Sequence, residues 1–309
     1  MEKRRKKSGF FLKLFMVLAI IAALVSGVYF ALDKLIVPKY FKVYGIENMH
    51  DLVGMVKTLY NSPNEKDMIT NGYIKSDLKN ATEKLKSANF PITETGVVDY
   101  IKISNGVNRD EIIKGEYEFT DREIAAIVDE MLKSESGILS SKLTHLEYID
   151  AININVLELI ITPETIGSNG NAEPIYATDK ANVSFTCKVD TSSVRSQMAS
   201  HMDTPIFLLN MIVPKTIYIQ VDYNLQKDQN GEWHSEKGNI GINGRTAKDS
   251  EILLNLLIEF IFPAEDEMTI DKLCESFGDI IIQGIEIFGE IEIKSNINGS
   301  GENGVLLKI

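Results

Sequence analysis

The feature that most constrains this chain is its N-terminus, where a basic cluster precedes a long apolar run. The cluster consists of Lys3, Arg4, Arg5, Lys6 and Lys7. In the following stretch, residues 10–32, Lys13 is the only charged residue. About 20 apolar residues in a helix span the ~30 Å hydrocarbon core of a bilayer. The sequence therefore predicts one transmembrane helix.

The basic cluster also predicts the direction of that helix. Positive charge beside a transmembrane segment stays in the cytoplasm. We therefore expect a cell-membrane protein with residues 1–9 as a cytoplasmic tail, residues 10–32 as a single-pass signal anchor and the C-terminal bulk outside the cytoplasm. The side chains expected to contact lipid are Phe10, Leu14, Phe15, Leu18, Ile21, Leu24, Val28 and Phe30.

A cleaved signal peptide is the alternative interpretation of this terminus. Val25, Ser26 and Gly27 are small residues of the kind that precede a cleavage site. The apolar run continues for five residues past Gly27, to Leu32, and this favours an uncleaved anchor. Residues 33–47 would then form a juxtamembrane stalk.

The charge of the remaining chain excludes one class of partner. The whole sequence has 32 Lys and Arg against 44 Asp and Glu, a formal net charge of −12. The first 32 residues hold six of the basic residues and only Glu2, so the rest has 26 basic and 43 acidic residues, a net charge of −17. A body this acidic repels phosphate backbones, so we expect no nucleic-acid partner.

Residues 48–136 show helical periodicity in three stretches. In the first two, apolar residues recur at helical spacing from Leu52 and from Leu78, and Ser76 is the predicted N-cap of the second. In the third, Thr120 and Glu123 form a capping-box pattern before an apolar stripe that begins at Ile124. The sequence predicts a mainly helical part over 48–136.

The period changes to 2 beyond about residue 145. Apolar and polar residues alternate over 152–156, 183–189, 217–225 and 285–293, as in half-buried antiparallel strands. Asn230 and Gly231 predict a hairpin turn. Two helices are expected near 249–262 and 270–283. The fold class is therefore α+β, with an antiparallel α+β domain over 143–309 after a Gly- and Ser-containing boundary at 137–142.

Two catalytic or nucleotide-binding patterns have simpler explanations. Gly299, Gly301 and Gly304 match a dinucleotide fingerprint, but only five residues follow, too few for the helix that would hold pyrophosphate. A turn between two C-terminal strands explains these glycines. Ser76 and Lys79 have the spacing of a penicillin-binding nucleophile motif, but the partner motifs are missing. We expect no catalytic residues at either place.

The metal-ligating and thiol residues are widely scattered. The four histidines are His50, His145, His201 and His234. Zinc ligands usually recur at close spacing, so these are expected to be surface or turn residues. The acidic run 265–267 with Asp271 is interpreted as a helix start rather than a calcium site. Cys187 and Cys274 are expected to be buried, with free thiols favoured over a disulfide. We expect no metal site and no cofactor.

Two segments are more apolar than their surroundings, and their role has two interpretations. They lie at 206–213, between two prolines, and in the expected helix at 249–262. Such segments either form the core, or line a cleft for an acyl chain or rest against the bilayer. The candidate lipid-binding residues are Phe207, Leu208, Met211, Leu253, Leu257, Phe260 and Ile261.

The order of these elements resembles a known family. The run 119–124, the strand series and the closing region 285–309 are similar to the YpmS-like single-span exterior proteins of Gram-positive bacteria. The resemblance implies an anchor, a capped helix and successive amphipathic strands. That family has no clear catalytic set, so the resemblance implies no functional residues. We therefore expect a non-enzymatic binding module for an envelope protein or a lipid, with an envelope hydrolase as the alternative.

Overall fold

The computed structural model describes residues 30, 32–42, 47–61, 63–93, 112–133, 153–168, 173–192, 214–246, 278, 289–299 and 301–309. The chain divides into two compact units, residues 1–57 and 58–309. No helix within these described ranges is long and apolar enough to cross a membrane. The predicted anchor lies outside them, except for residues 30 and 32.

The first unit contains short helical elements. A π-helix, Leu32–Ile36, is followed by α2, Val37–Phe41, and by the start of α3, Met49–Tyr60. The side chain of Asn48 accepts hydrogen bonds from the N–H groups of His50 and Asp51, at 2.9 and 3.0 Å. An Asn side chain in this position satisfies free amides of the first turn, which explains where α3 begins.

The second unit has three complete α-helices among its described residues: α4, Glu65–Met68, α5, Lys75–Ser87, and α7, Asp121–Lys133. A short 3-10 helix, η5, Ile297–Gly299, lies near its C-terminus. The predicted capping box of α7 is confirmed. The Thr120 N–H donates to the Glu123 carboxylate at 3.0 Å, and the Glu123 N–H donates to the Thr120 hydroxyl at 3.2 Å. The predicted N-cap of α5 is wrong. The cap is Ile74, whose N–H donates to Asp77 at 2.7 Å, and Ser76 lies within the first turn.

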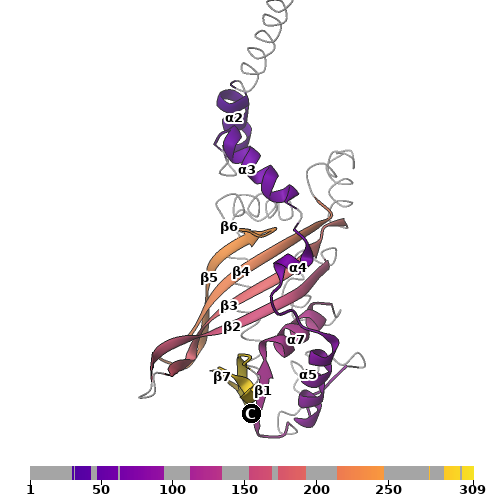
Figure 1. Ribbon diagram of the computed structural model, residues 1–309, viewed down its shortest axis with the longest axis vertical. Helices are drawn as coiled ribbons and strands as arrows, with labels where there is room; N and C mark the ends of the chain where they lie inside the picture. Colours follow the sequence, from indigo (N-terminus) through magenta and orange to yellow (C-terminus); the bar gives the residue numbers. More distant parts are fainter. Residues whose placement is uncertain are drawn as a thin grey trace, which may run out of the picture. The chain divides into compact units, whose positions relative to one another are not determined.

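A five-stranded antiparallel sheet forms the largest part of this unit (Figure 1). Its order along the sheet is β2, β3, β4, β5 and β6. The strands are β2, Asn153–Ser168, β3, Pro174–Asp190, β4, Thr216–Lys227, β5, Trp233–Ile242, and β6, Arg245–Thr246. Together with the helices, this sheet confirms the α+β class and the antiparallel pairing predicted from the alternation.

A second, three-stranded sheet joins distant parts of the chain. It has the order β1, Glu116–Thr120, β8, Gly304–Lys308, and β7, Glu290–Lys294. The predicted turn between two C-terminal strands is confirmed, since Gly299 and Gly301 lie between β7 and β8 with φ of 69° and 81°. Gly304 has a stricter requirement. A Cβ there would lie 2.0 Å from the Phe119 carbonyl oxygen, so only glycine allows β1 and β8 to pair.

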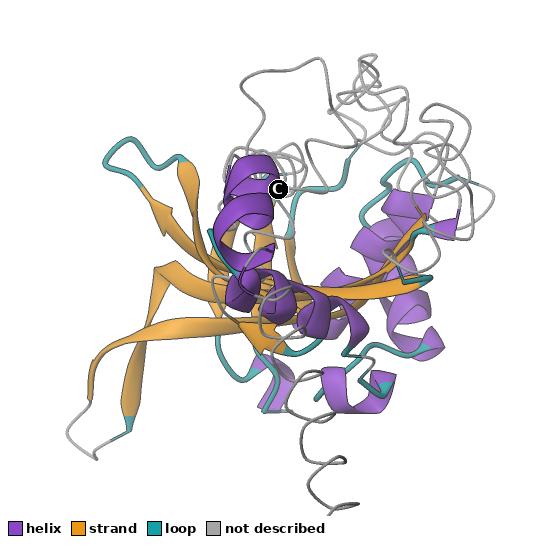
Figure 2. Cartoon of the chain, turned by 90° about the horizontal axis from the view of Figure 1, so that it is seen from above, coloured by secondary structure: helices purple, strands orange, loops and turns teal. Residues whose placement is uncertain are grey.

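The core lies where α7 packs on β2. Ile124, Ala125 and Val128 of the helix are buried, as are Val156 and Leu159 of the strand. Burial of such side chains is the main favourable contribution to folding. Two hairpins, β2–β3 and β4–β5, project at the same end of the five-stranded sheet (Figure 2).

Candidate functional site

The predicted membrane and lipid-binding residues lie almost entirely outside the described residues. Phe30 is the exception, with a side chain that is 63% exposed. The basic cluster at 3–7 and the apolar segments 206–213 and 249–262 are not among the described residues. The lipid-cleft prediction therefore stays a prediction.

One half of β2, residues 156–161, is covered by other parts of the chain, and polar side chains there bond to it. Asp129 of α7 is completely buried and accepts a hydrogen bond from the Val156 N–H at 2.6 Å. The other oxygen of its carboxylate accepts from the Tyr73 hydroxyl and the Lys133 ammonium. Burial, followed by the hydrogen bond to Asp129 and the charge of that carboxylate, raises the pKa of Tyr73, so the phenol keeps its proton and remains a donor. A buried carboxylate with this many donors is a structural group.

The same covered half continues along β2 to Ile161. Glu158 is buried and its carboxylate accepts from the N–H groups of Thr70, at 2.8 Å, and Asn71. Farther on, the side-chain amide of Asn303 donates to the Ile161 carbonyl at 2.9 Å. These contacts satisfy backbone groups that would otherwise lack partners. They tie the loop before α5 and the β7–β8 connection to the strand.

Asp121, at the start of α7, is a buried carboxyl group with a raised pKa. Burial raises the pKa of Asp121 to about 6, the N–H of Arg122 opposes this shift, and the charges of Glu302 and Glu158 add to it. A pKa near neutrality is typical of a general acid. The side chain is only 5% exposed and accepts a hydrogen bond from the Arg122 N–H of its own helix at 2.8 Å. It is poorly placed to reach a substrate.

The other half of β2 has a different character. The pairing of β3 with β4 begins at Lys180, and the part of β3 before Lys180 forms a two-stranded ribbon with the end of β2. We call residues 164–168 and 173–179 the β2–β3 arm. Three of its apolar side chains are exposed: Ile166 at 63%, Ile175 at 44% and Tyr176 at 38%.

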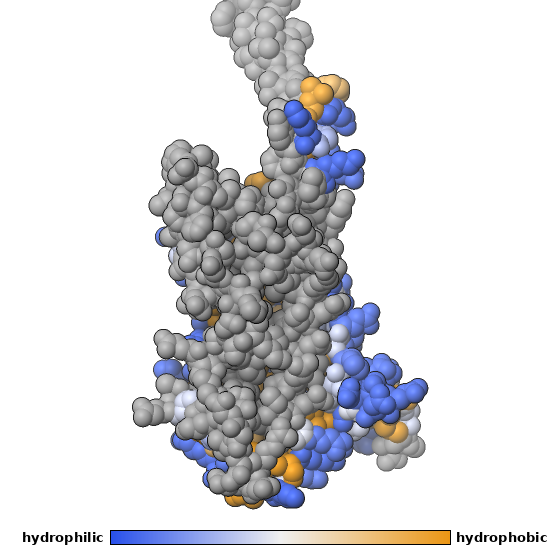
Figure 3. Space-filling view, turned by 180° about the vertical axis from the view of Figure 1, so that it is seen from behind, coloured by the Kyte–Doolittle hydropathy of each residue, from blue (hydrophilic) through white to orange (hydrophobic). Residues whose placement is uncertain are grey.

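Charge on the β2–β3 arm has one sign. Glu164, Glu173 and Asp179 are all exposed, and the arm contains no Lys or Arg. The face of the chain seen from behind is also mostly hydrophilic where side chains are described (Figure 3). Exposed apolar side chains surrounded by polar or charged ones are typical of a surface that binds another macromolecule.

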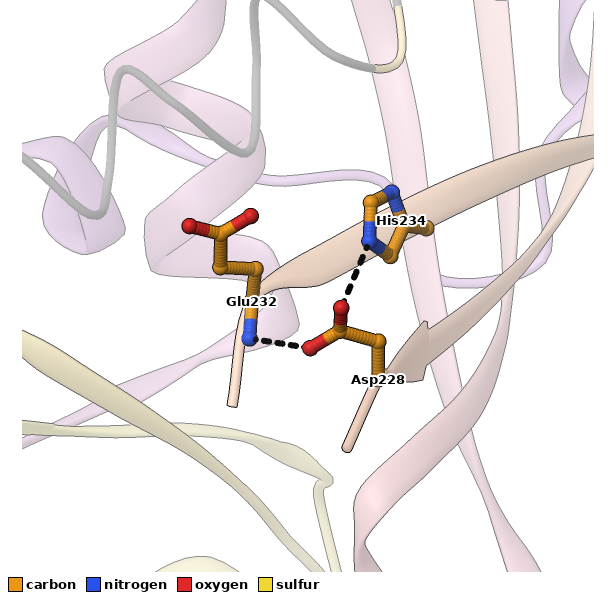
Figure 4. A group of neighbouring side chains, drawn as sticks. All are labelled: Asp228, Glu232 and His234. Carbon is orange, nitrogen blue, oxygen red and sulfur yellow. Dashed lines mark hydrogen bonds and ion pairs between the residues drawn. The ribbon is translucent and has the colours of Figure 1, made fainter. Parts of the chain in front are cut away.

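The turn of the neighbouring β4–β5 hairpin brings together three potential metal ligands: Asp228, Glu232 and His234 (Figure 4). Their ligand atoms lie within 4.8 Å of one another. This is the one group of three or more such residues found in the described part of the chain. The sequence prediction placed His234 in a turn or on the surface, and its side chain is 64% exposed.

The remaining predicted candidates have no catalytic surroundings. Cys187 is a buried free thiol, and burial together with the charge of Asp129 raises the pKa of that thiol above its usual range. Such a thiol is not a nucleophile. Ser76 and Lys79 are both exposed, and the Lys79 ammonium pairs with Glu83 at 3.7 Å instead of activating the serine.

Sequence reasoning missed the β2–β3 arm and the Asp228 group. The arm follows the alternation predicted for β3, but the predicted strand began at residue 183 and β3 begins at Pro174. For the Asp228 group a signal existed, because Asp228 precedes the predicted hairpin turn at Asn230 and Gly231, and Glu232 and His234 follow it. No protein-family model matches the chain, and no curated protein matches it.

Proposed function

We propose that this chain is a membrane-tethered, extracytoplasmic binding module that holds an envelope protein on its β2–β3 arm. The observation that carries the proposal is the exposure of Ile166, Ile175 and Tyr176 at the end of a long, paired ribbon. Exposed apolar side chains gain free energy when a partner removes them from water, about 25 cal/mol per Å² of apolar area. Exposure of these apolar side chains to water is unfavourable when no partner covers them, and this is a reason to expect a partner.

Charge favours a protein partner over a lipid surface. Glu164, Glu173 and Asp179 would be repelled by anionic lipid headgroups, which attract basic segments instead. A protein with an apolar centre and a basic rim complements the arm. The tether follows from the N-terminal basic cluster and apolar run, which would keep the second unit at the outer surface of the membrane.

The hydrolase alternative has less support. Asp121 has a pKa suited to proton transfer, but its burial and its hydrogen bond to Arg122 separate it from solvent. Reaction with a polymer such as peptidoglycan requires an accessible acid–base pair. A binding function makes no such demand on the site.

Photocrosslinking in the full-length chain tests the arm. A benzoylphenylalanine at position 166 should form an adduct with a protein when irradiated in cells, and the same residue at position 74 should not. Ile74 is a matched control because it is 56% exposed but lies at the start of α5. Adducts with lipid alone, or the same adducts from both positions, would remove the protein partner from the proposal.

A separate measurement tests the tether. A phosphatase reporter fused after Ile309 should be active, because that enzyme folds only outside the cytoplasm, whereas a cytoplasmic fluorescent reporter at the same place should be dark. Replacing all five basic residues at 3–7 with Glu should reduce the phosphatase signal. Activity of the cytoplasmic reporter alone would reverse the topology and withdraw the extracytoplasmic assignment.

A further inference from the structure

The β4–β5 hairpin brings three ligand-type side chains close together at its turn. Side chains alternate between the faces of a strand, so His234 lies on the face of β5 opposite Trp233, and Glu232 precedes the strand in the turn. Trp233 is buried, with the Lys227 ammonium 5.4 Å from its ring. His234 pairs in register with Gln226, two residues before Asp228. The packed tryptophan therefore fixes which way the His234 side chain points.

Asp228 is held in position by the turn itself. One carboxylate oxygen accepts the N–H groups of Asn230 and Glu232, at 2.8 and 2.9 Å. These bonds hold the carboxylate in one orientation. The second oxygen accepts from the Asn230 side chain at 3.0 Å and faces His234. A ligand oriented by other hydrogen bonds costs less to order when a metal binds.

The spacing between Asp228 and His234 suits a shared cation. The carboxylate oxygen and the imidazole Nε2 are 3.5 Å apart. This is longer than a strong charge-assisted hydrogen bond of about 2.7–2.9 Å. Two ligands bound at about 2.1 Å to one tetrahedral metal lie about 3.4 Å from each other. The Glu232 carboxylate, on an exposed side chain, lies within reach as a third ligand.

We propose that Asp228, Glu232 and His234 bind a divalent transition-metal cation of borderline softness, such as Zn²⁺, Ni²⁺ or Co²⁺. One imidazole and two carboxylates match the preferences of these ions. Ca²⁺ takes six to eight oxygen ligands and Mg²⁺ an octahedral oxygen shell, so neither fits this group as well. Water would complete the coordination because the site opens to solvent. The proposal is independent of the β2–β3 arm and of the partner proposed for it.

The only tryptophan of the chain, Trp233, reports on this site directly, since it lies between two of the ligands in sequence. Titration of the full-length protein in detergent with Co²⁺ should quench its fluorescence saturably at micromolar metal. Zn²⁺ should compete for the site. Asp228→Asn and His234→Gln should each weaken apparent affinity at least about tenfold. In Asp228→Asn the side-chain oxygen can still accept hydrogen bonds from the N–H groups of Asn230 and Glu232, so this variant should retain the hairpin.

Two further variants make the test decisive. His50→Gln removes another exposed histidine, on α3, and should leave the Co²⁺ titration unchanged. Glu232→His should tighten binding, because imidazole is a stronger ligand for these metals than carboxylate. Equal quenching in wild type, Asp228→Asn and His234→Gln, or quenching that needs millimolar Co²⁺, would overturn the site. Displacement of Co²⁺ by an equal concentration of Ca²⁺ would overturn the assigned class of metal.

Discussion

β2 has two halves that face different surroundings. The half from Val156 to Ile161 is covered. Its polar groups form hydrogen bonds with α7, with the loop before α5 and with the β7–β8 connection, and its apolar side chains at 156, 159 and 161 are buried. From Glu164 to Ser168 the strand is exposed on the β2–β3 arm. One strand is thus part of the core at one end and, in our proposal, part of a binding surface at the other. The difference comes from what the rest of the chain places beside it.

The largest expected effect comes from removing the group that covers the first half. Asp129→Ala would leave the Val156 N–H, the Tyr73 hydroxyl and the Lys133 ammonium without their common acceptor. Breaking a buried charged network costs about 3–5 kcal/mol. Urea unfolding followed by Trp233 fluorescence should show a loss of this size in the free energy of unfolding.

Glu130 provides the control for that variant. It also pairs with Lys133, at 3.6 Å, but its side chain is 26% exposed. Glu130→Ala should change the free energy of unfolding by less than about 1 kcal/mol. Similar losses from both substitutions would show that burial of Asp129 is not what makes it important.

The second effect concerns pH and the raised pKa of Asp121. Its carboxyl takes up protons more readily in the folded state, with a pKa of about 6 against an ordinary value of 3.8. The stabilisation from protonation is therefore complete below about pH 3.8 and lost as pH rises to 6. At 1.36 kcal/mol per pKa unit, the difference across this window is about 3 kcal/mol.

Asp121→Asn should remove that dependence. Relative to wild type, the variant should gain stability between pH 4 and pH 7, measured by urea unfolding at each pH. Asp179→Asn, on the exposed arm, is the matched control and should shift the curve little. A wild type whose stability falls no faster than that of Asp121→Asn over this window would contradict the assignment to Asp121.

A smaller effect is expected from neutralising Glu158. Glu158→Gln keeps an acceptor for the Thr70 and Asn71 amides but removes the charge from these hydrogen bonds. The expected loss is about 1–2 kcal/mol in the free energy of unfolding. Glu164→Gln, on the exposed half of the same strand, should cost less than about 0.5 kcal/mol. Reversal of this order would mean that the two halves of β2 are not distinguished by burial.

The smallest effect on stability is expected on the arm. Ile166 is 63% exposed, so Ile166→Ser should change the free energy of unfolding by less than about 0.5 kcal/mol. The double variant that also carries Ile175→Ser should nevertheless lose the crosslinked partner when the crosslinking residue is placed at position 176 instead of 166. Ile161→Ser, at 3% exposed on the same strand, should instead destabilise the protein by about 3 kcal/mol or more. Unchanged crosslinking in the double variant would separate the arm from the partner.

Local patterns predicted local structure well. The capping box at Thr120 and Glu123, the three longer helices and the central parts of β2 to β4 all follow from periodicity within about ten residues. The exceptions have local reasons too. Ser76 is a common cap by residue type, but Asp77 supplies a charged acceptor to the Ile74 N–H, and the helix begins at Lys75, two residues before the start that a Ser76 cap would give.

The candidate sites could be predicted only in part. The hairpin at Asn230 and Gly231 was predictable, and Gly231 has the positive φ, 84°, that such a turn needs. The exposure of the arm was not predictable, because alternation shows which residues share a face of a strand but not whether another element covers that face. The candidate lipid residues at 206–213 and 249–262 lie outside the described residues and stay a prediction.

By itself, the sequence determined the charge distribution, the apolar run near the N-terminus and the period of each segment, because these depend on residues that are neighbours along the chain. Only the tertiary structure decided that β1 pairs with β8, that Asp129 meets Val156 and that part of β2 remains uncovered. Such contacts join residues far apart in sequence, and their energies depend on burial and on complementary partners. Both properties arise only when the chain has folded.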